Sequence, residues 1–347
     1  MDYTQGYRAI FYATEFDPVT WTDFSADLTR RIDLISGSIS RTNTDLRQSA
    51  SLVTKDYNIG FEQWIRIYMV AEQMGEQKRE ALFTGIATSP SDSHQGVVVN
   101  SNIQCYSVLK PAADIYLSRG WYANKNMNAI TIIKELLKPI NPTNANVVIT
   151  PNNAEAYLQD YVIAEDQETN LTMIEKILDA IGWMMQIQGD GTIVLSPYTL
   201  LGQDEPVLTM SPYENDIVET SFNIEHDWFE CPNCIRVTYN GAIAIYKDED
   251  PDSPLSVQNR GREVWAVEDS PALSTGESLY EYAKLRLHEL QEMNEVATYT
   301  RRFMPEVNVD DIVRLGYSDL SGDFIVETQN INLGYAANVS ETVKRGV

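Results

Sequence analysis

Alternation of apolar and polar residues dominates the first 110 positions of the chain. It is seen in residues 35–42, up to Asn43, and recurs in 64–70, where Arg66 stands between Ile65 and Ile67. A period of two is typical of strands that bury one face. Further strand-like stretches, separated by turn residues, lie at 8–14, 49–54, 80–88, 96–100 and 103–109. Several short strands in succession predict a closed barrel or a sandwich.

Helical spacing of apolar residues begins after residue 110. Residues 128–138 carry one apolar stripe and stop before a proline, which cannot continue a helix. A second stripe ends at Gly182, and Thr172 with Glu175 has the spacing of a capping box at its start. Residues 183–195 then form a hairpin pattern around two glycines. This block predicts an α/β module.

Strand patterns return beyond Pro206, interrupted by one long helix. The helix is expected over 277–293, because Leu279, Ala283 and Leu287 lie on one stripe. A turn is expected at Pro305. The strands are expected at 218–224, 234–239, 243–246, 298–304, 309–315 and 322–333.

These elements predict an α+β fold that is mainly β. We expect two β-barrel-like domains with an inserted helix-containing α/β module and one long helix near the C-terminus. The expected limits are 1–110 for the first barrel, 111–203 for the module and 204–347 for the second barrel. An alternative assigns residues 204–240 to the first barrel as its closing segment.

Composition narrows the function classes. The chain has 347 residues, and 26 Lys and Arg face 50 Asp and Glu, for a formal charge of −24. Such a surface repels phosphate groups, so tight DNA binding is not expected. We also expect no membrane span and no signal peptide, because the sequence contains no apolar run of eighteen residues and no basic start before an apolar stretch.

The cysteines do not predict a metal site. Cys231 and Cys234 have the spacing of a zinc knuckle, but a structural zinc takes four ligands. Only Cys105 and His226 would be at hand to complete the set, and they would have to converge by chance. We expect no metal and no cofactor, and reduced thiols in a protein of cytoplasmic origin.

The acidic run 248–252 and the histidines do not predict chemistry either. The run lacks the spacing of an EF-hand, so a solvated loop is the default and calcium binding stays open. No nucleophile elbow, zinc-protease motif or phosphate loop accompanies the histidines, which are His94, His226 and His288. We therefore expect no enzyme. Arg119, Trp121 and Tyr122 are the candidate interface, because these residue types are enriched at binding hot spots.

The chain resembles the phage tail hub proteins of the late-control-D-like baseplate family. The resemblance rests on short patterns. Pro232-Asn233 opens a strand, and Arg302-Phe303 is followed by Pro305, by Asp310 within the run 309–313, and by Gly322. Further patterns of the same kind are Asp17-Pro18 with Trp21, Gly37-Ser38-Ile39, Phe83 to Ala87 and Tyr116-Leu117.

The resemblance implies a structural subunit of the virion tail tip. In the family a homotrimer forms a ring that joins the hexameric tail tube to a three-fold spike or fibre. It implies as partners a tail tube or distal tail protein, a spike or fibre protein and, as a further candidate, a tape measure protein. DNA or an effector would pass without tight binding, along an inner wall that we expect to be acidic or neutral.

Two other functions stay open from the sequence. One is a cell-wall hydrolase and the other a glycan-binding protein of the tail tip. Relatives often continue into a peptidase, lysozyme or fibre-binding domain. The sequence ends at Val347 without such a pattern, so we expect no wall digestion by this chain.

Overall fold

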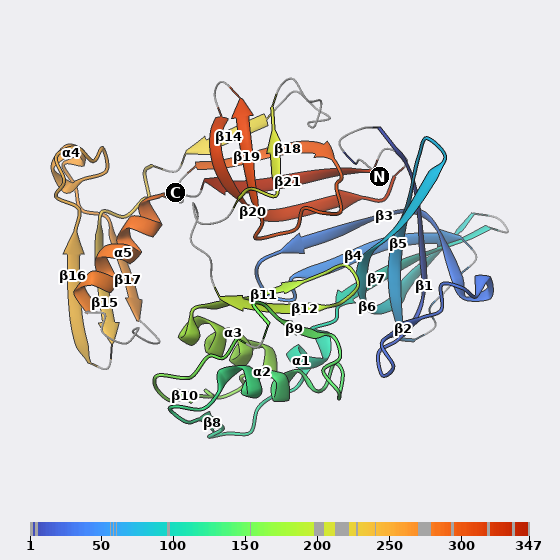
Figure 1. Ribbon diagram of the computed structural model, residues 1–347, viewed down its shortest axis with the longest axis horizontal. Coiled ribbons are helices and arrows are strands. Elements are labelled where there is room, and N and C mark those ends of the chain that lie inside the picture. Colours follow the sequence, from blue (N-terminus) through green and yellow to red (C-terminus); the bar gives the residue numbers. More distant parts are fainter. Residues whose placement is uncertain are drawn as a thin grey trace.

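The computed structural model describes residues 3, 6–55, 57, 59, 61–95, 98–152, 154–197, 205–211, 222–226, 228–239, 241–269, 279–292, 295–317, 320–334 and 337–345. It is mainly β, as predicted. Four parts are visible in Figure 1: the first barrel, a second sheet above it, a helical module below, and a small unit at the left.

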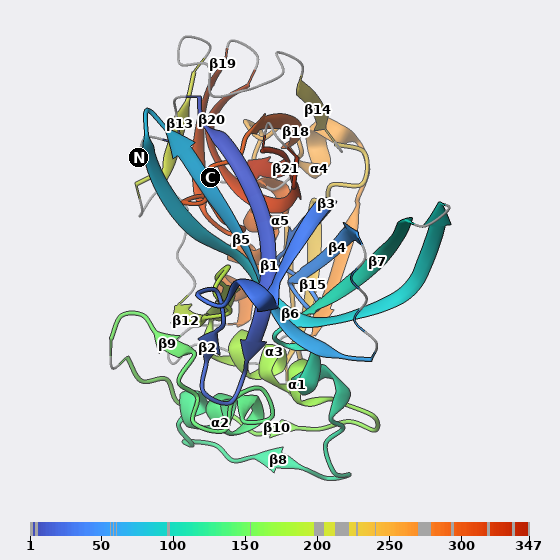
Figure 2. The same cartoon turned by 90° about the vertical axis from the view of Figure 1, so that its right-hand side faces the viewer.

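The first barrel is a closed ring of six strands. Its order is β3-β4-β7-β6-β5-β1, and β1 pairs with β3 to close it. The strands are β1 (Arg8–Asp17), β3 (Arg31–Thr42), β4 (Gln48–Lys55), β5 (Gln63–Gln73), β6 (Glu76–Gln95) and β7 (Val98–Ser107). A short β2 (Thr22–Asp23) pairs with β1, and a 3-10 turn, η1 (Leu28–Arg30), precedes β3. In the turned view, β1, β5 and β6 rise obliquely above the helices (Figure 2).

The second sheet also has six strands, in the order β14-β18-β21-β20-β19-β13. They are β13 (Leu208–Met210), β14 (Phe222–His226), β18 (Glu295–Arg302), β19 (Ile312–Tyr317), β20 (Leu320–Asn332) and β21 (Asn338–Arg345). Strand β20 also pairs with β3 of the first barrel, from Thr328 opposite Thr42 to Asn332 opposite Ser38. One continuous sheet therefore joins both parts, and their buried side chains form a single apolar core.

The alternative that residues 204–240 complete the first barrel is wrong for the part of that segment that the structure describes. Strand β13 pairs with β19, and β14 pairs with β18, so both belong to the second sheet. The first barrel closes on itself through β1 and β3, so its ring is complete without a strand from this segment.

The module is built on three helices. They are α1 (Lys110–Asp114), α2 (Ala129–Leu137) and α3 (Asn170–Ile181). Asn128 caps α2, and α3 ends at Gly182, which has a left-handed φ of 66°. The capping box of α3 differs from the expected one: it joins Thr169 to Thr172 rather than Thr172 to Glu175. The hydroxyl of Thr172 thus takes the role expected of a glutamate side chain.

Two small sheets complete the module. The predicted hairpin is β11 (Trp183–Ile187) and β12 (Ile193–Pro197), with β9 (Val147–Ile149) added in parallel to β12. Two short strands, β8 (Tyr122–Ala123) and β10 (Val162–Ile163), pair on the other side of the helices (Figure 1). The module has its own apolar core.

The small unit forms a core separate from the core shared by the first barrel and the second sheet. Its sheet has the order β16-β15-β17, from β15 (Cys234–Tyr239), β16 (Ala242–Lys247) and β17 (Trp265–Asp269), with a short α4 (Val257–Arg260). The long helix α5 (Leu279–Glu292) packs on this sheet through Ala283 and Leu287. We keep 1–110, 111–203 and 204–347 as proposed domain limits, with the small unit inserted in the third.

Candidate functional site

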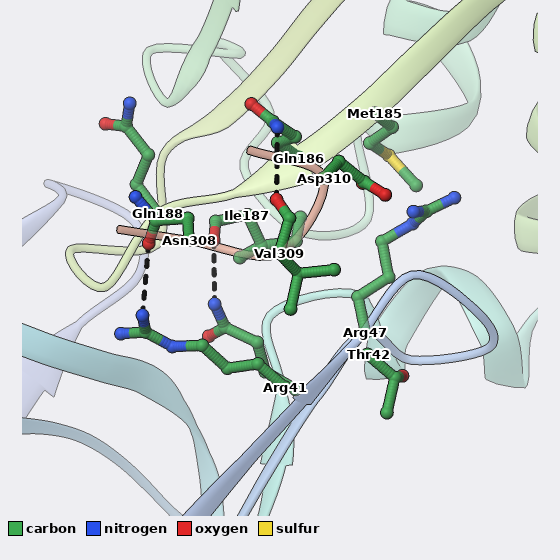
Figure 3. Close-up of a pocket in the computed structure, with 11 residues that line it drawn as sticks. Arg41, Thr42, Arg47, Met185, Gln186, Ile187, Gln188, Asn308, Val309 and Asp310 are labelled. Carbon is green, nitrogen blue, oxygen red and sulfur yellow. Dashed lines mark hydrogen bonds between the residues drawn. The ribbon is translucent and has the colours of Figure 1, made fainter. Parts of the chain in front are cut away.

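A polar junction joins the first barrel, the module hairpin and the loop 303–311. Gln48 Nε2 donates to the carbonyl oxygen of Ile187 at 2.7 Å, and Gln186 Nε2 donates to that of Val309 at 3.2 Å (Figure 3). Arg41 Nη1 reaches Asn308 Oδ1 at 3.0 Å. The three parts enclose a cavity of about 40 Å³. Side chains from each part thus bond to backbone or side chains of another.

The tip of the hairpin is pressed against the first barrel. Arg66 Nη2 donates to the carbonyl oxygen of Asp190 at 2.6 Å, and Thr84 Oγ1 donates to that of Gly189 at 3.0 Å. A Cβ at Gly189 would lie 2.0 Å from the carbonyl oxygen of Ala81. Only glycine allows this approach of two backbones.

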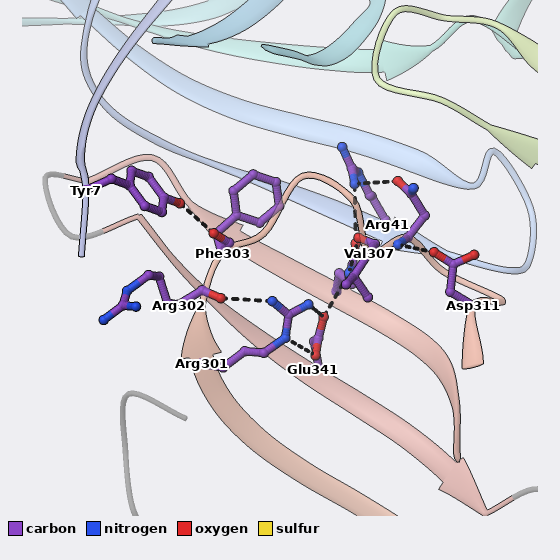
Figure 4. Close-up of polar contacts among 10 residues, drawn as sticks. Tyr7, Arg41, Arg301, Arg302, Phe303, Val307, Asp311 and Glu341 are labelled. Carbon is purple, nitrogen blue, oxygen red and sulfur yellow. Dashed lines mark hydrogen bonds and ion pairs between the residues drawn. The ribbon is translucent and has the colours of Figure 1, made fainter. Parts of the chain in front are cut away.

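A buried ion pair stands at the centre of the second sheet. Arg301 Nε donates to Glu341 Oε2 at 2.7 Å, and neither side chain has any exposed area (Figure 4). Gln329 Nε2 adds a bond to Glu341 Oε1 at 2.8 Å. Burial acts to lower the pKa of Arg301, but the charge of Glu341 and its hydrogen bonds outweigh burial, and the pKa is raised. Arg301 therefore keeps its charge inside the core.

Arg41 extends this network toward the junction. Its guanidinium is buried, donates to the carbonyl oxygen of Leu82 at 2.8 Å, and reaches Gln329 Oε1 at 3.3 Å. Burial lowers the pKa of Arg41 to about 10, and burial raises the pKa of nearby Asp311 to about 6. The network runs without interruption from the ion pair to the junction, so it fixes the angle between the barrel and the second sheet.

The other side of the continuous sheet has the opposite character. Three cross-strand rows of outward-facing Ser, Thr, Asn and Gln residues cross it, and Arg302, Glu327 and Lys344 flank these rows on the same side. We call this surface the neutral face. The first row is Thr300, Ser340, Asn330, Ser40 and Ser49; the second is Asn332, Ser38, Ser51, Gln104 and Thr88; the third is Thr298, Thr342, Thr328 and Thr42.

The rows of the neutral face are held in register by side-chain bonds. Gln104 Nε2 donates to Ser51 Oγ at 3.2 Å, and the hydroxyls of Thr298 and Thr342 lie 3.5 Å apart. A groove of about 510 Å³ runs over the seam between the first barrel and the second sheet, with Ser38 and Asn330 in its lining. The seam between the two parts is therefore open to solvent on this side.

Comparison with known proteins identifies the fold. No protein-family model matches the chain, and no curated protein matches it. Among solved structures, the 43 kDa tail protein of prophage MuSo2 from Shewanella oneidensis aligns with a TM-score of 0.67 and 12% identity, over 97% of this chain and 98% of that chain. The tail protein from Neisseria meningitidis MC58 gives 0.68 and 15%, over 98% and 97%. This chain has the fold of phage tail proteins.

The same fold extends to secretion systems. An Escherichia coli component of the type VI secretion system, similar in structure to T4 bacteriophage tail proteins, aligns with a TM-score of 0.55 and 8% identity, over 91% of this chain and 74% of that chain. The resemblance drawn from the sequence is thus confirmed for the tail-protein fold. The identities are low, so the fold is what these structures share.

The three residues of the candidate interface lie on different sides of a pair of antiparallel segments. Residues 115–123 run antiparallel to 162–170, and Tyr122 stands opposite Ile163 on the outer side, where it is 57% exposed. Trp121 faces inward and packs against the module core. Arg119 lies at the exposed turn, 3.6 Å from Asp166. Tyr122 and Arg119 are thus accessible to a partner, whereas Trp121 stabilises the module.

Four of the five family-pattern residues have visible structural roles. Asn233 is fully buried and donates to the carbonyl oxygens of Leu255 and Arg262, at 3.0 and 2.9 Å, just after Pro232. Pro305 stands in a turn in which the N–H of Val307 bonds to Met304. Asp310 and Gly322 have positive φ angles of 69° and 139°. We assign no separate role to Pro232.

The acidic loop is more ordered than a solvated loop. Asp248 is 7% exposed, and its Oδ2 accepts bonds from Ser253 Oγ at 2.6 Å and Gln291 Nε2 at 3.0 Å. These donors occupy an oxygen that a calcium ion would need. In the described residues no group of three or more His, Cys, Asp or Glu is placed to hold a metal ion.

Cys105, Cys231 and Cys234 are buried and form no disulfide in the parts described. Burial raises the pKa of Cys234 and, more strongly, that of Cys105. Thiols held protonated in this way are poor nucleophiles and poor metal ligands. Among the helices that the structure describes, none is long and apolar enough to span a membrane.

The sequence predicted neither the junction nor the neutral face. The buried network had one visible signal, since Arg301 and Glu341 occupy strand positions whose neighbours at i±2 are apolar, and Arg41 follows Ile39 at the same spacing. A charge in the apolar phase of a strand marks a buried polar group. The neutral face needs the strand pairing, because its rows combine residues far apart in the chain.

Proposed function

We propose that this chain is a structural subunit of a tail tip, and that three copies form a ring between a hexameric tail tube and a three-fold spike or fibre. The observation that carries the proposal is the continuous sheet through β3 and β20, which holds two six-stranded parts side by side in one subunit. Three subunits would present six such parts, which matches the six-fold symmetry of a tube.

The interior of the chain supports a role as a rigid structural part. The two six-stranded parts share one apolar core, and the network of Arg41, Gln329, Arg301 and Glu341 fixes them to each other. A subunit that must hold two ring positions at a constant angle needs this rigidity. Two phage tail proteins and a component of a type VI secretion system share this fold, which supports a position of this chain in a tail tip.

The proposed partners are those of a hub. They are two further copies of the chain, a tail tube or distal tail protein on one side and a spike or fibre protein on the other, with a tape measure protein as a further candidate. DNA or an effector would pass through the ring without tight binding, since the formal charge is −24 per subunit. The site of action would be the virion tail tip.

Electron microscopy of the purified protein tests the proposal. Averaged end-on views are expected to show a ring with a central hole, three-fold symmetry and six similar densities. Release of wall fragments from purified peptidoglycan, lost when one Glu is replaced, would instead establish a hydrolase. Particles without a ring would contradict the proposed assembly.

A further inference from the structure

We infer that the free edge of strand β9 binds an extended segment of a partner protein, which adds to the module sheet as a fourth strand. The inference goes beyond the proposed function and does not depend on the ring, because the edge and the groove beside it lie within one subunit. The occupant is identified by its backbone, which must be a polypeptide in strand conformation.

The first argument is the position of β9 in its sheet. The order is β11-β12-β9, so β12 covers one edge of β9 and no strand in the described part of the chain covers the other. The turned view shows β9 at the margin of the module, beside β12 (Figure 2). Its residues Val147, Val148 and Ile149 favour strands, and none of them is a charge or a proline of the kind that shields edge strands.

The second argument is the pattern of backbone bonds to β12. The N–H of Ile193 donates to the carbonyl oxygen of Asn146 at 2.7 Å, and the N–H of Thr150 donates to that of Leu195 at 2.9 Å. In a parallel pair the residues that bond to the neighbour alternate along the strand, so Val148 bonds to β12 as well.

The backbone groups of Val147 and Ile149 therefore point away from β12. The N–H of Val147 donates to the carbonyl oxygen of Asn144 at 3.0 Å. Within the described ranges, no residue bonds to the carbonyl oxygen of Val147 or to the N–H and carbonyl oxygen of Ile149. Backbone groups of this kind require hydrogen-bond partners when they are covered. A partner in strand conformation supplies the matching donors and acceptors.

The third argument is the space beside the free edge. A groove of about 710 Å³ is lined by β9 and by the first turns of α2. Its apolar lining includes Ile130 of α2, Val147, Ile149 and Ala154. Side chains of an added strand would point alternately toward this lining and toward solvent. The segment therefore needs an apolar residue at every second position.

The fourth argument is the charge at the groove. Lys134 of α2 lines it and forms no ion pair with the residues that the structure describes. Glu155 lines it too, but its Oε2 already accepts a bond from the hydroxyl of Tyr157 at 2.7 Å. A carboxylate on the added segment would pair with Lys134, so we expect the segment to carry an acidic residue.

Capture of a synthetic peptide on an engineered thiol tests the inference in the purified protein. Asn152→Cys places a thiol at the groove, Ser118→Cys places a control thiol on an exposed turn of the module, and the three native cysteines are buried. The probe alternates valine with threonine, contains one glutamate and ends in cysteine. At equilibrium with a small thiol, Asn152→Cys should hold about tenfold more peptide than Ser118→Cys, because strand pairing adds to the disulfide link.

A second peptide separates strand addition from other modes of binding. It carries an N-methyl group at every valine and threonine, which removes the amide donors and keeps the side chains. Its capture by Asn152→Cys should fall to the level of Ser118→Cys. Equal capture of the two peptides at Asn152→Cys would overturn the inference, and so would equal capture of the first peptide at both thiols.

Hydrogen exchange and a charge reversal give two further readouts. Capture should slow exchange at the N–H of Ile149 and leave that of Thr150, which is already bonded to β12, unchanged. Unchanged exchange at Ile149 in the captured complex would overturn the inference. Lys134→Glu should lower capture of the glutamate peptide about two- to fivefold and raise that of a peptide with lysine in its place. A fall for both peptides would overturn the role assigned to Lys134.

Discussion

The buried ion pair of Arg301 and Glu341 gives a sharp test of how the second sheet is stabilised. Both side chains are fully buried, and Gln329 completes the bonding of the carboxylate. Glu341→Gln keeps the shape and removes the negative charge, so the guanidinium of Arg301 is left in the core without its partner. Removing one partner of a buried ion pair lowers the free energy of unfolding by about 3–5 kcal/mol.

The double variant Arg301→Met with Glu341→Leu removes both charges. We expect it to recover most of the loss, because apolar replacement of a whole buried pair is often neutral or stabilising by about 1–4 kcal/mol. The free energy of unfolding is followed by far-UV circular dichroism in urea, at one protein concentration for all variants, since an oligomer's apparent stability depends on concentration.

A surface pair in the same sheet is the control. Arg314 Nε lies 2.6 Å from Asp323 Oδ1, and the Arg314 side chain is 51% exposed. Asp323→Asn should cost less than about 1 kcal/mol. A loss for Glu341→Gln no larger than that of the control would refute the reasoning, as would a double variant no more stable than the single one.

Three further predictions follow from the junction. Gly189→Ala should lower the free energy of unfolding by about 1–3 kcal/mol, because the new Cβ would meet the carbonyl oxygen of Ala81. The control Gly6→Ala has open space around its new Cβ and should change the urea midpoint little. Equal midpoints for the two variants would contradict the close contact at Gly189. Burial raises the pKa of Asp311 from 3.8 to about 6, so the stabilisation from its protonated form is full below pH 3.8 and is lost as the pH rises through about 6. Asp311→Asn should flatten that part of the stability profile, and an unchanged profile would show that another group causes it. Gln48→Leu removes the 2.7 Å hydrogen bond to the carbonyl oxygen of Ile187 and should weaken the attachment of the hairpin by about 1–3 kcal/mol. The module should then be cleaved faster by a protease. An unchanged rate of cleavage would exclude a role for this bond in holding the hairpin.

Local patterns predicted the elements of this chain well. The helices expected at 128–138 and 277–293 are α2 and α5, and the hairpin expected at 183–195 is β11 with β12. These elements are recognisable in the sequence by their apolar periodicity and by glycine or proline at their ends. The five-residue α1 was missed, because so short a helix has too few turns to show a stripe.

The pairing of strands that are far apart in the chain could not be predicted from local sequence patterns. Nothing local shows that β20 pairs with β3, some 290 residues away, or that β15, β16, β17 and α5 form a unit of their own. Register depends on which apolar faces meet in three dimensions. The neutral face and the junction both depend on that register, so their residues look ordinary when read along the chain.

The mass of the purified protein in solution tests the central claim most directly. Light scattering coupled to size exclusion gives it without a standard curve. The ring predicts three times the subunit mass of 39.3 kDa, near 118 kDa, at every concentration in the working range. A particle that stays at 39.3 kDa while fully folded would contradict the proposed hub.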